Sequence, residues 1–431
     1  MIDLEEFLRS IADNDGKNGI SLFLFHTVMF AASAFVDISH IQNEGYASRN
    51  EARHTLFRRA KVLLDVGFEE DPLVTIQAIL LMVHWNDIPR AEKDAVHWIG
   101  VSLSLAMSVG LHINPDPSTV TVSKQRVWRR TWWCVYNHCQ LISEKLLSAL
   151  HMHEDREGES GLEMPMIDLN DFEFHVYSPE AQSTVNECDI LQNMEYQKMQ
   201  AVFFIQKVKL CRLSSFSTIS NRIKKMVRGE AIQDLEKYFT TGTVPHGADA
   251  LQKWLFQLPD TAKPHYPLGL IPSEMKKSTY LHRAWLRLIY LGSIYATYCD
   301  GSHPMGEAFE ELATSPSPHL PKQCLLDMMD LFDEIGSLGL SEQLPCLATP
   351  FAVLVLTFHR HLLENDMQSG KDVVSRSVHK CWNLIKQLQE SSDLALRIIQ
   401  AVENPTSGLW ERLLPGQVSY KNQSQASINT P

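Results

Sequence analysis

The chain is 431 residues long, with 44% hydrophobic and 21% charged residues, which is the composition of a folded protein with a sizeable apolar core. Its formal net charge at pH 7 is −12. A chain this acidic has no overall attraction for phosphate, so binding to a nucleic acid would require a local basic patch.

Eight cysteines are scattered along the chain, and no pair of them has the C-x-x-C spacing. This pattern provides neither a zinc ribbon nor a thioredoxin-like redox pair. We expect the thiols to behave as small apolar side chains in a reducing compartment. The cysteines are Cys134, Cys139, Cys188, Cys211, Cys299, Cys324, Cys346 and Cys381.

The longest apolar run, residues 20–36, is too short and too interrupted to span a membrane. It is neither placed nor flanked like a signal peptide. We expect a buried helix there, and no association of the chain with a membrane. The interrupting polar residues are Ser21, His26, Thr27 and Ser33.

Helical periodicity is clear in the segments that follow. Over residues 73–83, apolar side chains recur every three or four positions, and Asp71-Pro72 supplies an N-cap and a proline at the first helical position. A second apolar stripe covers His97–Leu111, with Gly110 as its terminating glycine. The sequence Asn114-Pro115-Asp116-Pro117 then breaks the chain.

The rest of the chain has no alternating segment long enough to build a sheet. The predicted fold class is therefore all-α, a multi-helix array without a β-sheet. Gly301–Pro321, which is rich in Pro, Ser and His, is expected to be a loop. Further helices are expected at Ser123–Leu150, Cys188–Leu213, Thr279–Tyr298, Lys322–Ile335 with Gly336 as its stop, Pro350–Glu364 and Asp372–Glu403.

Pro165–Glu180 is the best candidate for a seam between two helical halves. We expect an N-terminal helical domain over residues 1–176 and a C-terminal helical region over residues 177–414. Residues 415–431 are polar and poor in bulky apolar side chains, so a disordered tail is expected there.

Sequence motifs for enzymatic chemistry are missing: there is no G-x-G-x-x-G, phosphate-cradling loop, H-E-x-x-H or G-x-S-x-G. Asp327, Asp330 and Asp333 have the spacing of acids that bind magnesium in helical terpene synthases. Apolar residues fill the other face of that segment, which is typical of a solvated amphipathic helix. We expect no catalytic residue, no cofactor, no bound metal, and a protein that is not an enzyme.

Three other polar clusters have an ordinary structural interpretation beside a functional one. "HMHED" (151–155) and "HRH" (359–361) contain possible metal ligands, but histidines two residues apart diverge on a helix, and a polar loop is the simpler interpretation. "NRIKKMVR" (221–228) is the densest basic stretch; it is either a phosphate-binding or nuclear-import patch or the exposed face of a helix.

The stretch "RVWRRTWWCVY" (126–136) interleaves arginines and tryptophans, as a nucleic-acid platform would. On a helix, however, its aromatic side chains form a very wide apolar surface that belongs in an interior. We therefore expect Trp128, Trp132 and Trp133 in the core. Arg129 and Arg130 are then expected to bind carboxylates, or carbonyls at the ends of neighbouring helices.

These segments, in this order, resemble the fungal-specific transcription factor domain, the helical middle region of fungal zinc-cluster regulators, with wording closest to regulators of the cutinase transcription factor type. The resemblance covers "TIQAILLMVHW" (75–85), "DAVHWIGVSLSLAMSVGLHINP" (94–115), "VWRRTWWCVYNHCQLIS" (127–143) and "EMPMIDLNDFE" (163–173). The residues that match the family signature are Trp98, Gly100, Gly110, Leu111, His112, Arg129, Arg130, Trp132, Trp133, Pro165, Asp171 and Phe172, together with Leu169.

Two features depart from the family pattern. Cys139-Gln140 stands where an Asp-Arg pair usually follows the double tryptophan, and no Gly-Arg-Pro occurs near Leu147. The resemblance also implies a six-cysteine zinc cluster upstream, but no cysteine precedes Cys134. We therefore expect the 431 residues not to bind duplex DNA specifically by themselves.

The resemblance implies a nuclear regulator of RNA polymerase II transcription, possibly of a metabolic gene set. Without a DNA-binding module of its own, it would act through other transcription factors or co-regulators, or as a homo- or heterodimer, and contact DNA only indirectly or through a missing N-terminal module. Two alternatives stay open at this point: a repurposed helical protein that senses a ligand or binds a partner, and a helical metal-dependent enzyme.

Overall fold

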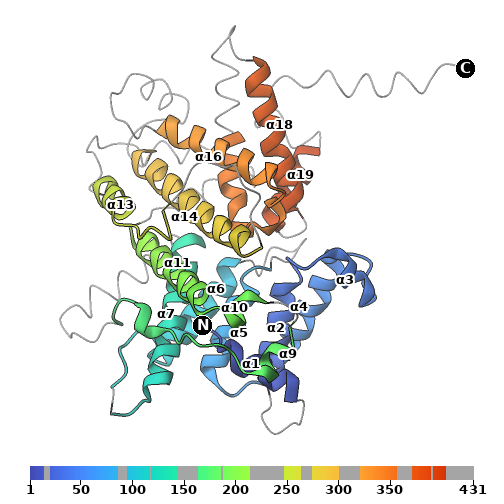
Figure 1. Ribbon diagram of the computed structural model, residues 1–431. Coiled ribbons are helices and arrows are strands. Elements are labelled where there is room, and N and C mark those ends of the chain that lie inside the picture. The colour runs from blue at the N-terminus through green and yellow to red at the C-terminus, as the bar shows by residue number, and fades with distance from the viewer. Residues whose placement is uncertain are drawn as a thin grey trace, which may run out of the picture. The chain divides into compact units, whose positions relative to one another are not determined.

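The computed structural model describes residues 1–13, 20–85, 95–116, 118–142, 164–185, 188–213, 247–263, 274–299, 321–356, 371–389 and 392–403 (Figure 1). Within these ranges every regular element is a helix and none is a β-strand, which confirms the all-α prediction. None of the helices in these ranges is both long and apolar enough to cross a membrane.

The described chain divides into two compact units, and the division falls inside the helix α14. The first unit comprises Met1–Thr218 and Asp249–Ile289, and the second comprises Ile219–Ala248 and Tyr290–Pro431. The division expected at residue 176 stays a prediction, although the first compact unit continues beyond it. The expected tail, 415–431, lies outside the described residues.

The first unit begins with the helices that precede the arginine and tryptophan motif. They are α1 (Leu4–Asp13), α2 (Leu22–Ala32), α3 (Ile38–Asn43), α4 (Arg49–Asp65), α5 (Pro72–Met82), α6 (Ala95–Ser108) and α7 (Val122–Ile142). After them come η1 (Leu169–Asp171), α9 (Pro179–Ser183), α10 (Asp189–Gln192), α11 (Met194–Arg212), α13 (Gly247–Phe256) and the first part of α14 (Glu274–Cys299).

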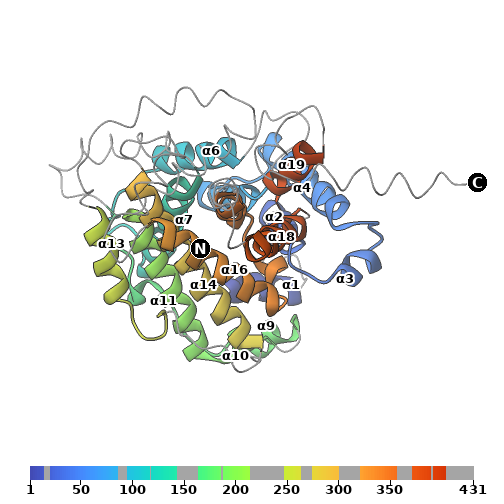
Figure 2. The same ribbon diagram turned by 90° about the horizontal axis from the view of Figure 1, so that it is seen from above.

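Packing in the first unit follows the chain order: α2 lies against α4 and α5, α5 against α6, α6 against α7, and α7 against α11 (Figures 1 and 2). Aromatic rings fill the space between α2, α4, α5 and α6. Phe57 stacks on Trp85 with ring centroids 4.8 Å apart and meets the edge of Trp98 at 5.7 Å. These buried rings supply the large apolar area that stabilises a helical core.

The charged side chain of Arg53 enters this core. Arg53 is 3% exposed, and its guanidinium lies 4.7 Å from the centre of the Phe30 ring. It also donates a 3.0 Å hydrogen bond to the carbonyl of His84, just beyond the end of α5. Arg53 therefore satisfies a carbonyl at a helix terminus, where the last carbonyls have no partner within the helix.

The second unit contains the end of α14, then α16 (Pro321–Ser337), η3 (Ser341–Gln343), η4 (Cys346–Ala348), helical residues 349–356, α18 (Lys371–Leu388) and α19 (Asp393–Glu403). α18 packs against both α16 and α19. Two buried hydroxyls, those of Thr349 and Ser392, share a hydrogen bond of 2.8 Å within this unit. Their mutual bond satisfies two polar groups that are removed from water.

The start and stop signals read from the sequence are confirmed for two helices. Asp71 accepts a 2.7 Å hydrogen bond from the amide of Leu73, and Pro72 is the first residue of α5. Gly110 has a φ of +73°, and the amide of Leu111 then donates to the carbonyl of Ala106 at 2.9 Å. This reversal ends α6, because few residues other than glycine adopt a positive φ.

Two long helices expected from the sequence are each two helices, which corrects the prediction. The segment Cys188–Leu213 is split into α10 and α11 by Asn193, whose side chain accepts a 3.1 Å hydrogen bond from the amide of Tyr196. The segment Asp372–Glu403 is split into α18 and α19, and the Ser392 hydroxyl accepts from the amide of Ala395. Short polar side chains compete for backbone amides, so they start helices inside apolar stretches.

The predicted stop at Gly336 is also wrong. α16 continues through this glycine to Ser337, and the chain turns at Gly339, which has a φ of +66°. Two other predicted helices can be compared only over part of their length. The helix predicted at Ser123–Leu150 is described as far as Ile142, and the helix predicted at Pro350–Glu364 as far as residue 356. Residues 143–150, 301–320 and 357–364 lie outside the described parts of the chain.

Alanine substitutions at Gly110 and Gly336 should change the stability of the protein in opposite directions. Gly110→Ala should destabilise the protein by about 1–2 kcal/mol, because an L-residue is strained at positive φ although no atom lies within 4 Å of the new methyl group. Gly336→Ala should stabilise it by up to about 1 kcal/mol, because alanine is the better helix former and the nearest atom, Ser341 Oγ, is 3.9 Å away. Urea unfolding of both variants measures the two changes in stability. Changes in the same direction would contradict the positive φ of Gly110 or the helical position of Gly336.

Candidate functional site: the arginine and tryptophan motif of α7

The segment that α7 binds, residues 164–173, is held in shape by its own carboxylates. Asp168 accepts a 2.7 Å hydrogen bond from the amide of Asn170, and Asp171 accepts a 2.9 Å bond from the amide of Asp168. This reciprocal capping closes the single turn η1. The other carboxylate oxygen of Asp171, Oδ1, is therefore free of the turn and faces α7.

The arginines of α7 bind this segment. The Nη1 atom of Arg129 is 2.5 Å from Oδ1 of Asp171, whose side chain is 2% exposed. Arg130 donates a 2.8 Å hydrogen bond to the backbone carbonyl of Asp171, and Arg126 pairs with Glu173 at 2.9 Å. The prediction that Arg129 and Arg130 are held by a carboxylate or a carbonyl is confirmed.

Among the ion pairs formed within the described residues, the pair between Arg129 and Asp171 is the most buried. The side chain of Arg129 is 20% exposed and that of Asp171 is 2% exposed. A carboxylate this deeply buried is stable only when its charge is compensated and its oxygens accept hydrogen bonds. Asp171 meets both conditions through Arg129 and the amide of Asp168. The pair therefore holds the segment in one register on α7.

The tryptophans of the motif belong to the core. Trp132 and Trp133 are 7% and 5% exposed, and the indole of Trp133 donates a 3.0 Å hydrogen bond to the carbonyl of Pro165. Arg212 of α11 lies over the ring of Trp133 at 5.8 Å. The expected burial of these two rings is confirmed, whereas Trp128 is only partly buried. Rings enclosed in this way cannot stack on bases.

The other signature residues lie in α6 and in the turn that follows it. Trp98 and Leu111 are 2% and 0% exposed, and Gly100 lies inside α6. The carbonyl of His112 accepts a 3.0 Å hydrogen bond from the amide of Met164, and the His112 ring lies 5.9 Å from that of Trp132. His112 therefore joins the chain after α6 to the segment 164–173 and to α7, whereas Trp98 packs on Phe57 of α4.

The family's charged pair after the double tryptophan is replaced by neutral groups. Cys139 is fully buried, and this burial raises the pKa of its thiol to about 12. Gln140 donates a 2.9 Å hydrogen bond to the hydroxyl of Tyr136, one turn earlier in α7. A thiol with so high a pKa is unreactive at neutral pH, so Cys139 acts as a small apolar residue. Leu147 lies outside the described residues.

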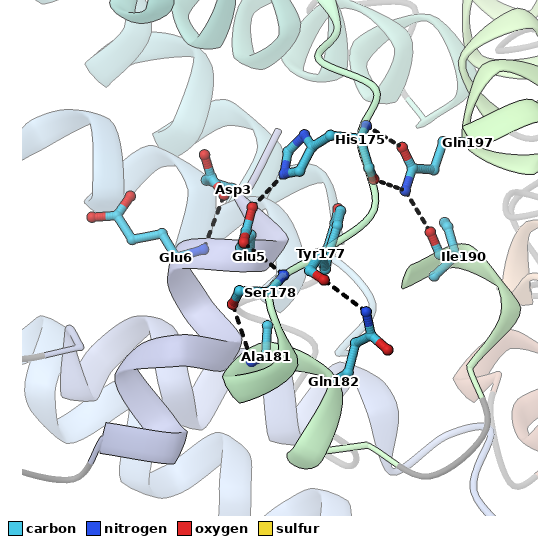
Figure 3. Close-up of polar contacts among 10 residues, drawn as sticks. All are labelled: Asp3, Glu5, Glu6, His175, Tyr177, Ser178, Ala181, Gln182, Ile190 and Gln197. Carbon is cyan, nitrogen blue, oxygen red and sulfur yellow. Dashed lines mark hydrogen bonds and ion pairs between the residues drawn. The ribbon is translucent and has the colours of Figure 1, made fainter. Parts of the chain in front are cut away.

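Sequence reasoning missed a second polar assembly, which attaches α1 to the chain beyond the motif (Figure 3). The carboxylate of Glu5 pairs with Nε2 of His175 and accepts a 3.0 Å hydrogen bond from the amide of Ser178. Gln197 then binds the amide and the carbonyl of His175 and the carbonyl of Ile190, at 3.1, 2.8 and 2.7 Å. These bonds hold α1, the segment before α9, and the start of α11 together.

No local pattern marks Glu5 as special, since it is one of two adjacent glutamates in the first turn of an amphipathic helix. The contact with His175 spans 170 residues and exists only after folding. The hydrogen bond from His175, followed by those from Ser178, lowers the pKa of Glu5 below its ordinary value against the opposing effect of burial. The lowered pKa means that the folded chain favours the carboxylate form.

The candidate metal sites gain no support from the described residues. Asp333 pairs with Lys380 at 2.6 Å, and Asp327 accepts a hydrogen bond from Gln323 at 2.8 Å. In the part of the chain that the structure describes, no three His, Cys, Asp or Glu side chains are grouped to hold a metal ion. The clusters at 151–155, 221–228 and 359–361 lie outside that part.

The sequence of this helical unit, which contains the buried motif, identifies the class of protein to which the chain belongs. The family model described as the fungal specific transcription factor domain matches residues 1–236, which include both polar assemblies of the first unit. The chain belongs to this family. The resemblance inferred from the signature residues is thereby confirmed.

Curated relatives match along nearly the whole chain. Cutinase transcription factor 1 beta of Fusarium vanettenii is 27% identical over 409 residues, which cover 90% of this chain and 45% of that protein. Transcription factor cpaR of Aspergillus oryzae is 26% identical over 410 residues, or 91% of this chain and 66% of that protein. The chain thus spans about half to two thirds of these relatives. No solved structure matches it.

Replacing Trp132 should destabilise the protein more than replacing Arg129. Trp132→Ala removes a buried ring and should cost about 3–5 kcal/mol, a large part of a typical domain's stability of roughly 5–15 kcal/mol. Arg129→Ala should cost about 3 kcal/mol, the lower end of the range for breaking a buried ion pair, because it leaves the charge of Asp171 uncompensated although Asp171 keeps one hydrogen bond. Thermal denaturation measures both, and an unchanged midpoint for Trp132→Ala would contradict its place in the core.

Glu5→Gln should destabilise the protein at pH 7, because the amide keeps the shape of the side chain but loses the charged acceptor of the hydrogen bonds from His175 and Ser178. A lowered carboxyl pKa contributes stability above the unfolded value of about 4.3, and this contribution disappears as the pH falls through the folded value. The difference in unfolding free energy between wild type and Glu5→Gln should therefore shrink below about pH 4. Glu6→Gln, at the exposed neighbouring position, is the control and should show no such change.

Proposed function

We propose that the chain is the regulatory middle region of a fungal transcription regulator, acting in the nucleus on RNA polymerase II transcription. The observation that carries this proposal is the family match over residues 1–236, which include the arginine and tryptophan contacts of α7. Relatives named as transcription factors and as regulators of acetamidase agree with it.

The proposed mode of action is through other proteins, with DNA contacted indirectly or through a module outside these 431 residues. Two observations support it. The net charge is −12, which opposes association with a polyanion, and the three arginines of the α7 motif bind Asp171 and Glu173 within the fold. Other transcription factors, co-regulators or a second copy of the chain are the partners that we propose.

The test is to place the chain on a promoter artificially. Fused to a DNA-binding domain of known specificity, it should change the activity of a reporter gene in fungal cells, upwards from a weak promoter or downwards from a strong one. Trp132→Ala should reduce the change, because loss of the buried ring destabilises the first unit.

Lys124→Gln is the matched control, since Lys124 lies on the exposed start of α7 and should leave the change intact. A tagged copy of the same fusion reports whether the protein is intact and nuclear. Reporter activity that stays unchanged at both promoters, with intact nuclear protein, would overturn the proposal.

A further inference from the structure

Basic side chains from α11 and α14 lie near one another in the first unit. The ring of Phe203 stacks on that of His282 of α14, with centroids 5.1 Å apart. Lys207, one turn later in α11, places its ammonium group 5.8 Å from the centre of the Phe204 ring. Burial, and then the charge of Lys207, lower the pKa of His282 to about 4.

Two more histidines belong to this region, one of them on α7, which packs against α11. The rings of His84, just after α5, and His138, in α7, meet edge to face with centroids 5.7 Å apart. Burial and Lys207 lower the pKa of His138 to about 4; burial, His138, Arg53 and Lys207 lower that of His84 to about 3. The four side chains of His84, His138, Lys207 and His282 are all partly exposed.

Lys207 supplies the positive charge of this cluster. At pH 7 the three imidazoles are neutral, because their pKa values lie well below that pH. Among the described residues no carboxylate forms an ion pair with Lys207, in contrast to Arg129 with its partner Asp171. A partly buried ammonium group without a counter-charge favours the binding of an anion beside it.

A buried amide beside the cluster has the same need for a partner. Asn137 is 1% exposed, and neither atom of its amide group forms a hydrogen bond with any described residue. Trp133, one turn earlier in α7, contacts Arg212 of α11, so Asn137 also lies on the side of α7 that faces α11. Buried amides without a partner are rare and destabilising, and a bound polar group would satisfy this one.

We propose that Lys207, Asn137, His138, His84 and His282 form a binding site for a small oxyanion, a carboxylate or a phosphate. Lys207 provides the charge and Asn137 a hydrogen-bond donor. His138 donates from Nδ1 to the carbonyl of Cys134 at 2.8 Å, so its Nε2 is a hydrogen-bond acceptor, which suits the hydroxyl of a hydrogen phosphate and not a carboxylate. The site would make the stability of the first unit depend on an anionic metabolite.

The proposal does not rest on the transcriptional role, and it is tested on the purified chain. Butyrate and inorganic phosphate are each titrated against the thermal midpoint, with sodium chloride at matched ionic strength as the reference. At least one of the two anions should raise the midpoint in a saturable way, because a ligand that binds only the folded state stabilises it. The anion that does so identifies the chemical source.

Lys207→Gln should weaken the binding of that anion by about tenfold or more, as expected for the loss of a charged hydrogen-bond donor. Lys207→Arg, which keeps the charge, should restore most of it. Lys209→Gln is the matched control, because Lys209 is exposed on the same helix and its substitution changes the net charge equally. If Lys207→Gln does not fold, the imidazole NMR signals of His84, His138 and His282 in the wild type serve instead and should shift with the same saturation.

Two results would overturn the proposal. One is a wild-type midpoint and imidazole signals that respond to butyrate and phosphate no more than to chloride. The other is a folded Lys207→Gln variant that binds the anion as tightly as Lys209→Gln does, since the anion would then lie elsewhere.

Discussion

The buried ion pair between Arg129 and Asp171 joins two parts of the chain that are 42 residues apart in sequence. Asp171 can be buried only because Arg129 compensates its charge and the amide of Asp168 binds its other oxygen. The register that this pair sets brings the carbonyl of Pro165 to the indole of Trp133 and the amide of Met164 to the carbonyl of His112. Through these bonds α6, α7 and the segment 164–173 form a single assembly.

The same geometry decides what the basic residues of α7 can do. An arginine whose guanidinium binds a buried carboxylate or a backbone carbonyl is held by the protein, and releasing it to bind phosphate would leave that partner uncompensated. The family signature is accordingly a set of structural contacts in this chain. Under the proposed function, regulation would depend on surfaces outside this set of contacts.

Two cations of the first unit illustrate how a fold distributes charge. Arg129 has an internal carboxylate, Asp171, as its counter-charge. Lys207 has its ammonium group over the Phe204 ring, and its charge contributes to lowering the pKa of three histidines from other parts of the first unit. Burial lowers the charge that the histidines carry, so the cluster avoids strong repulsion between cations and keeps one charge for an anion.

The sequence by itself determined the all-α class, the N-cap at Asp71, the end of α6 at Gly110, and the burial of Trp132 and Trp133, because these features depend on local periodicity and on the φ that each residue tolerates. It misplaced the breaks at Asn193, Ser392 and Gly339, where short-range capping and turns interrupt long apolar stretches. It predicted that the arginines of α7 have acceptors, but only the tertiary structure identified Asp171. The contact of Glu5 with His175 and the grouping of histidines around Lys207 were likewise decided by the tertiary structure, since each joins helices distant in sequence and no local pattern encodes such a meeting.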